Sequence, residues 1–195
     1  MPGPTVSYAK VEAALVQMHN IAPEDVSAFR ARFGALQRGG LFGAENQPGK
    51  GRKLQYGPDQ FHRLVLTFEL IQLGIVPSVI LPLIDQYWDS KLRDIFAKAE
   101  RANVHNTSNV VLILVGVAAL NSERAVPNIN HSTMAKLGEI TAFALDGEGP
   151  LPARALLVNL SAQLSKFHDA LAGYHLEPEP VTTRKSKGKQ RLAKR

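Results

Sequence analysis

Glycine and proline residues divide the first half of the chain into short segments that each carry helical periodicity. Within every segment the apolar residues recur three or four positions apart, which is the pattern of a helix with one buried face. We expect helices at 8–18, 23–38, 59–74, 77–84 and 87–102. Pro23 suits the first turn of a helix, whereas Gly39-Gly40 and Gly74 suit helix ends.

The second half of the chain has shorter and more varied segments. Val110–Leu120 is an unbroken apolar run of 11 residues and predicts a strand. Glu139–Leu145 predicts a second strand beyond a polar loop that contains Pro127, and a final helix is expected at 152–174. The expected fold class is therefore mainly α with small β elements, with a small α+β region at the C-terminal end.

The charge of the chain is unevenly distributed. The net charge is +6, with 8 basic and 5 acidic residues in 1–63 and 8 basic against 12 acidic residues in 64–183. The last twelve residues carry 7 basic side chains and no acidic one. Basic ends around a mildly acidic middle indicate contact with a polyanion through the ends.

A strongly basic turn occupies Asn46–Tyr56. Two glycines and a proline mark a tight turn, and the residues that flank it can pair as a short hairpin. Lys50, Arg52 and Lys53 lie within four positions at its tip, where they suit contact with a phosphate backbone. A loop for nucleotide phosphates is disfavoured because glycine, not Ser or Thr, follows Lys50 and no apolar strand precedes it.

The helix expected at 23–38 has two different faces. Its apolar stripe consists of Val26, Phe29, Phe33 and Leu36. The opposite side presents small residues, bordered by Arg30 and Arg38. Small residues allow close approach to another surface, and arginine side chains reach phosphates or base edges. This face therefore favours DNA, with packing of another helix as the alternative.

The order helix, turn, helix, basic hairpin, helix, short helix is that of a winged helix–turn–helix. Residues 38–84 resemble MerR-type transcriptional regulators, and the matching positions are Gly40-Leu41, Arg52, Tyr56, Arg63-Leu64, Leu70, Gly74-Ile75 and Val79-Ile80. The usual arginine-tyrosine-tyrosine run of that family is replaced here by Phe33-Gly34-Ala35-Leu36. The resemblance implies a homodimer on a pseudo-palindromic operator, with the helix at 23–38 in the major groove.

Together these features predict a sequence-specific transcriptional regulator that binds double-stranded DNA as a homodimer. The expected DNA-binding residues are Arg30, Gln37, Arg38, Lys50, Arg52, Lys53, Tyr56 and Arg63. Because a dimerising helix commonly follows the DNA-binding module in the family, Trp88, Leu92 and Ile95 are candidates for a subunit interface, with ordinary core packing as the alternative. Two other functions remain open: a phage-type or architectural DNA-binding protein, and a protein-interaction adaptor that uses a winged-helix fold.

The expected organisation has three parts. Residues 1–84 form the winged helix–turn–helix domain, residues 85–175 form a linker or dimerisation helix with a small α+β domain, and residues 176–195 form a flexible basic tail. The sequence does not identify a small-molecule effector for the C-terminal half.

Several classes of chemistry find no support in the sequence. Without cysteine there are no disulfides, thiolate zinc sites or thiol nucleophiles. None of the six histidines belongs to a pair four positions apart on a helix with a carboxylate ligand beside it, which is the usual pattern of a zinc site. His62 is expected at the surface. We therefore expect no enzyme activity, metal or cofactor. The longest apolar run is shorter than the roughly 20 residues that a bilayer requires, and no secretion signal is evident, so a cytoplasmic, bacterial-type protein is expected.

Overall fold

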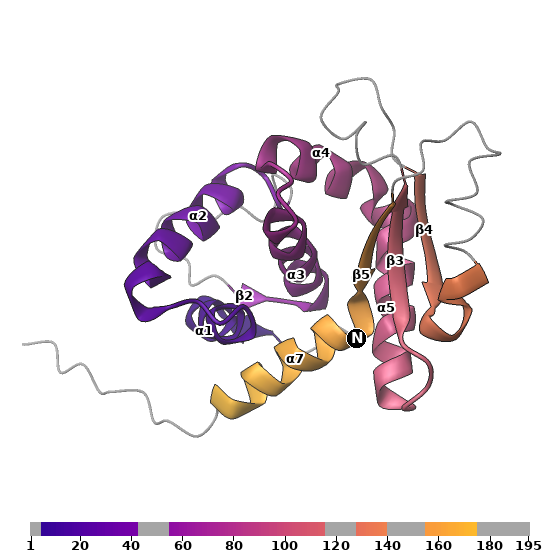
Figure 1. The fold of residues 1–195 in the computed structure, drawn as a ribbon. Coiled ribbons are helices and arrows are strands. Elements are labelled where there is room, and N and C mark those ends of the chain that lie inside the picture. The colour runs from indigo at the N-terminus through magenta and orange to yellow at the C-terminus, as the bar shows by residue number, and fades with distance from the viewer. Residues whose placement is uncertain (1–4, 43–54, 116–127, 140–154, 175–195) are drawn as a thin grey trace, which may run out of the picture.

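The first half of the chain folds into successive helices, as the spacing of glycine and proline predicted (Figure 1). The computed structural model describes residues 5–42, 55–115, 128–139 and 155–174. In that part of the chain the elements of the first half are β1 (Val6–Ser7), α1 (Tyr8–Met18), η1 (Pro23–Asp25), α2 (Val26–Arg38), β2 (Gln55–Tyr56), α3 (Pro58–Gln72) and α4 (Pro77–Tyr87). A π-helical segment, η3 (Trp88–Leu92), then leads directly into α5 (Arg93–Val104).

A tight turn joins α1 to α2. Asn20 has a φ of 50°, in the left-handed region that asparagine tolerates better than most residues, and Ile21 N–H donates to the carbonyl of Val16. Pro23 opens a 3₁₀ turn, so α2 begins three residues later than the sequence predicted. At the far end Gly40 has a φ of 92°, which explains the glycine where the helix ends.

Strand β2 is the described end of the predicted basic hairpin. It pairs antiparallel with β1, with Val6 opposite Tyr56 and Ser7 opposite Gln55. The partner seen here is therefore the start of the chain, which the hairpin prediction did not include. The rest of the hairpin, including its tip, lies outside the described residues.

The second half contains a three-stranded antiparallel sheet in the order β4-β3-β5. Its strands are β3 (Val110–Val115), β4 (Asn128–Thr133) and β5 (Ala155–Asn159), with the short helix η5 (Met134–Lys136) after β4 and α7 (Leu160–Gly173) after β5. Helices α5 and α7 both contact β3. The described part of the molecule is thus mainly helical with two small antiparallel sheets.

Two predictions for this half need correction. Glu139, the first residue of the strand predicted at Glu139–Leu145, is helical, and 140–145 lie outside the described residues. The polar segment Asn128–Thr133, which was not predicted as a strand, pairs with β3. The final helix begins at Leu160, because residues 155–159 form a strand next to β3. There Asn159 caps the helix by accepting a hydrogen bond of 3.1 Å from the Ala162 N–H.

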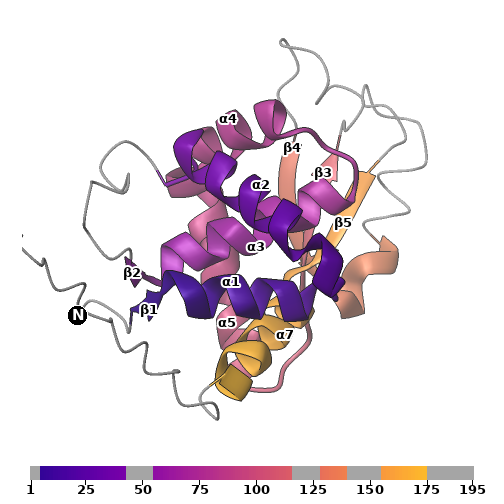
Figure 2. The same cartoon turned by 90° about the vertical axis from the view of Figure 1, so that its left-hand side faces the viewer.

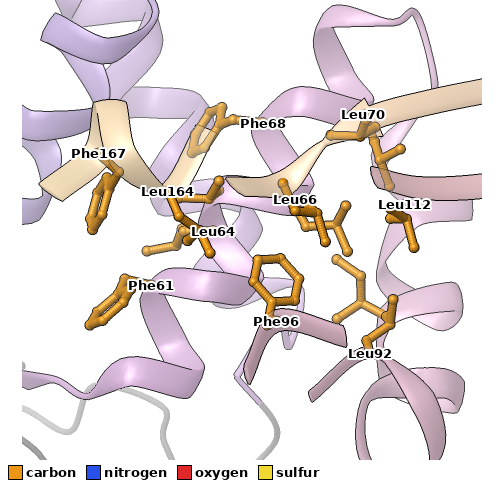
Figure 3. Packing of buried hydrophobic residues seen from close by; sticks show 14 of the residues in the cluster. Phe61, Leu64, Leu66, Phe68, Leu70, Leu92, Phe96, Leu112, Leu164 and Phe167 are labelled. Atoms are coloured by element: carbon orange, nitrogen blue, oxygen red, sulfur yellow. The ribbon is translucent and has the colours of Figure 1, made fainter. Parts of the chain in front are cut away.

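The hydrophobic core is continuous from the first helices to the sheet. Figure 3 shows α3 contributing Phe61, Leu64, Leu66, Phe68 and Leu70, which meet Leu92 and Phe96 from η3 and α5, Leu112 from β3, and Leu164 and Phe167 from α7. One cluster of buried residues therefore spans the boundary predicted between residues 84 and 85. Across that boundary the helical backbone also continues without a break.

The three residues predicted for a subunit interface belong to this core. Trp88 and Leu92 are fully buried and Ile95 is 3% exposed within the single chain. Their side chains are covered by the chain's own helices, so they offer no surface to a second subunit. Ordinary core packing, the alternative left open by the sequence, is what the structure contains.

No helix in the described part of the chain has both the length and the apolar character needed to cross a membrane.

Candidate nucleic-acid interface

Helix α2 lies on the outer surface of the molecule. Figure 2 shows α1 and α2 side by side, with α3 behind them. Phe29, Phe33, Leu36 and Gln37 are buried on the inner side of α2. Phe29 stacks on Phe68 of α3 with ring centroids 4.8 Å apart, and Phe33 stacks on Tyr8 of α1 at 5.0 Å. These ring contacts hold one face of α2 against its neighbours and leave the other face to solvent.

The solvent face of α2 consists of small residues and arginines. Its exposed residues are Ser27, Ala28, Arg30, Ala31, Arg32, Ala35 and Arg38. Arg38 lies back over the helix, since a β-carbon at Gly34 would be 3.4 Å from an Nη atom of Arg38. Arg32 was missed by the sequence analysis, although its position next to Phe33 of the apolar stripe places it at the edge of this face.

Arg30 is paired with a carboxylate of α1. Its Nε lies 2.9 Å from Glu12 Oε1, and one Nη lies 2.6 Å from the same oxygen. Glu12 is buried, whereas the Arg30 side chain is 59% exposed. Burial together with the Glu12 carboxylate raises the pKa of nearby Tyr8 to about 12. The ion pair between Arg30 and Glu12 therefore holds α1 against α2, and Arg30 also borders the exposed face.

Two predicted DNA contacts are instead buried together. The Gln37 amide donates a hydrogen bond to the Tyr56 hydroxyl, and this contact joins α2 to β2. Tyr56 is fully buried, and burial raises the pKa of its hydroxyl. The prediction that these side chains contact DNA directly is wrong for this structure, since neither reaches the surface. Both side chains lie at the junction between α2 and β2.

Arg63 also has a partner inside the chain. Its guanidinium lies 4.6 Å from the centroid of the Trp88 ring, and an Nη donates to the Leu41 carbonyl at 3.2 Å. Burial lowers its pKa, although aspartates nearby act in the opposite direction. Arg63 thus ties the end of the α2 region to α3 and η3. Lys50, Arg52 and Lys53, the remaining predicted contacts, lie outside the described residues.

The turn that precedes α2 is acidic. Glu24 and Asp25 are exposed in η1, where they stabilise the positive end of the helix dipole. The arginines begin one turn further along, at Arg30. Negative charge therefore precedes the helix, and positive charge lies along the remainder of its exposed face.

His62 is buried, contrary to the prediction that it lies at the surface. It is 7% exposed, and its Nε2 is 2.8 Å from Glu100 Oε1; His168 Nε2 lies 2.9 Å from the same oxygen. The cluster joins α3, α5 and α7. Within the described residues no group of three His, Asp or Glu side chains is arranged to hold a metal ion. We interpret these polar contacts as holding the three helices together.

No family model matches this chain, and no curated protein matches it.

Proposed function

We propose that the chain is a double-stranded DNA-binding regulator and that the exposed face of α2 contacts the major groove. The observation that carries the proposal is the two-sided character of α2. One face is anchored by ring contacts to α1 and α3, and the other presents small residues bordered by arginines to solvent. An outer helix with this division is suited to insertion into a groove.

The dimensions of α2 fit that role. The major groove is about 12 Å wide and admits one α-helix, and small side chains allow its backbone to approach the base edges. Arg32 and Arg38 are six residues apart, which is about 9 Å along a helix. Two arginines at that separation contact different base steps or phosphates rather than competing for one.

The acidic first turn indicates how DNA approaches α2. Glu24 and Asp25 repel phosphate, so we place the contacts from Arg30 to Arg38. Arg30 acts mainly by keeping α2 in position through Glu12, while Arg32 and Arg38 make the direct contacts. Gln37 and Tyr56 act indirectly, by fixing α2 to β2.

The winged helix–turn–helix and the homodimer belong to the same proposal. The order α1, turn, α2, basic segment, β2, α3 supports a wing formed by the segment before β2, with Lys50, Arg52 and Lys53 on the phosphate backbone. The resemblance of residues 38–84 to MerR-type regulators supports a dimer on a pseudo-palindromic site. Since Trp88, Leu92 and Ile95 are buried in one chain, a dimer must use other residues.

A selection from pooled random duplex oligonucleotides with the purified full chain tests this function. A regulator enriches a defined motif, and a dimer enriches that motif as two symmetric half-sites. Binding that is independent of sequence and proportional to DNA length would instead identify an architectural protein. Absence of any binding at about 50 mM salt, where electrostatic affinity is strong, would contradict the proposal altogether.

A further inference from the structure

A basic cleft opens between the end of α5 and the β4–η5 segment. Its volume is about 640 Å³, and the loop after α5 closes one side. Lys98, Arg101, His105, His131 and Lys136 line it, together with four hydroxyl side chains between Thr107 and Thr133. Among these described lining residues there is no aspartate or glutamate. The cleft therefore combines positive charges and hydroxyl groups with an apolar wall that includes Ala102 and Val110.

Lys98 is held in a defined position at this cleft. Its Nζ lies 2.9 Å from Asp94 Oδ2 and 3.1 Å from His131 Nε2. An ammonium group can only donate, so the His131 Nε2 accepts and the proton of the neutral ring is on Nδ1. Partial burial and Lys98 lower the pKa of His131, and Asp94 acts in the opposite direction. The Asp94 carboxylate acts on both Lys98 and Arg101, and it offsets one of the three permanent positive charges of Lys98, Arg101 and Lys136, so the cleft keeps a net positive charge.

We propose that this cleft binds the phosphate group of a small phosphorylated molecule. A phosphate group presents three acceptor oxygens and up to two negative charges, which match a site built from cations and hydroxyls. The volume lies within the range of about 300–1,000 Å³ that is usual for small-molecule sites.

The position of the cleft favours a small molecule over the DNA backbone as the source of the phosphate. In Figure 1, β4 and the end of α5 lie on the side of the molecule opposite α2. A straight duplex on the α2 face does not reach them. The cleft is therefore a separate site, and the inference does not depend on the proposed DNA binding.

NMR titration of the full chain with inorganic phosphate at constant ionic strength and pH 7.5 tests the proposal. The imidazole signals of His105 and His131 report on the cleft. We expect saturable shifts of both signals, and affinity at least tenfold weaker in Arg101→Gln and in Lys136→Gln. The exposed Lys166 on α7 provides the control, since Lys166→Gln removes one charge away from the cleft and should leave the affinity unchanged.

Two results of the phosphate titration would contradict the proposal. Shifts that do not saturate, or equal affinity in all three variants and the wild type, would show that phosphate has no site here. A parallel titration with duplex DNA distinguishes the two sources of phosphate. If Arg101→Gln weakens DNA binding tenfold as well, the cleft contacts the DNA backbone and the small-molecule proposal is wrong. If DNA binds and inorganic phosphate does not, this inference fails while the proposed function stands.

Discussion

At the scale of single residues, the arginines of this chain have different tasks that the sequence could not separate. Arg30 and Arg38 were predicted as DNA contacts because they border the small-residue face of the helix at 23–38, and Arg63 because it lies in the segment that resembles MerR-type regulators. The structure pairs Arg30 with Glu12 and places Arg63 over Trp88. Helical periodicity identifies the face on which an arginine lies, but its partner depends on residues brought close only by folding.

The contact between Gln37 and Tyr56 leads to a first prediction. Tyr56→Phe removes the acceptor of a buried amide, and an unsatisfied buried polar group costs about 1–3 kcal/mol of stability. Urea unfolding of the two proteins measures this difference. Tyr174, which is 43% exposed, provides the matched control: Tyr174→Phe should change the free energy of unfolding little. Equal stability of Tyr56→Phe and wild type would show that the contact is not formed in solution.

The contacts of Glu100 with His62 and His168 lead us to expect that stability depends on pH. Burial alone would raise the pKa of Glu100, but hydrogen bonds from His168 and His62 outweigh it and lower the pKa to about 2. The hydrogen bond to Glu100 also raises the pKa of His168 above its usual value near 6.5. The carboxylate therefore stabilises the fold above about pH 4.5, and this stability is lost as the pH falls towards 2. The charged His168 stabilises it below about pH 6.5, and that part is lost as the pH rises through the raised pKa.

Glu100→Gln tests this arrangement. At pH 6 we expect it to lower the free energy of unfolding by about 1–3 kcal/mol, because the two histidines lose a charged acceptor. The difference from wild type should shrink towards pH 9 as His168 loses its proton. Guanidinium unfolding across that range gives both numbers. A difference that stays constant between pH 6 and pH 9 would contradict the assigned charge states.

At the scale of elements, Ser161 joins a helix, a strand and a second helix. Its buried hydroxyl accepts from Val110 N–H at 2.9 Å and contacts the Ala99 carbonyl at 3.4 Å. Ser161→Ala leaves the first amide of β3 without its partner, at a cost of about 1–3 kcal/mol. Thermal unfolding should show a lower Tm for this variant than for Ser165→Ala, which changes an exposed residue on the same helix. Identical Tm values would mean that another group satisfies Val110.

The helices could be predicted from the sequence, and most of the strands could not. Segments such as 59–74 repeat with helical spacing and end at glycine, so their local preferences and their packing agree. Strand β4 is polar and pairs along one edge of β3, with Ile129 as its buried apolar residue, so no alternating pattern revealed it. Strand β5 and the start of α7 form one apolar run, in which only the cap at Asn159 marks the change.

The candidate site, too, could be predicted from the sequence only in part. The two faces of α2 followed from periodicity, and Arg38 was placed correctly on the exposed face. The burial of Gln37 and Tyr56 depends on β1 pairing with β2, a contact between distant segments. The basic cleft joins α5 to β4, whose strand character was missed, so no local motif indicated it.

At the scale of the whole molecule, the continuous core predicts that both halves unfold together. Trp88, Leu92 and Phe96 fill the space between α3 and the sheet, so residues 1–84 alone would expose the buried face of α3. Circular dichroism of the full chain should therefore show one cooperative thermal transition. A fragment of residues 1–84 should show none, or one at a much lower temperature. Two separate transitions in the full chain would indicate two independent cores.

Salt dependence of DNA binding tests the central claim, that the exposed face of α2 contacts DNA. Fluorescence anisotropy with a selected duplex compares wild type with the double variant Arg32→Gln/Arg38→Gln. Lys91→Gln/Lys166→Gln changes two exposed lysines and equals the first variant in net charge. Each lost phosphate contact reduces the slope of log affinity against log salt by about 0.9.

We predict that the arginine variant binds at least tenfold more weakly than wild type at about 100 mM salt, with a slope reduced by about 2 if both arginines contact phosphate. The lysine variant should match wild type in both quantities. Equal losses in the two variants, or no loss in the arginine variant, would contradict the assignment of α2 as the DNA-contacting element.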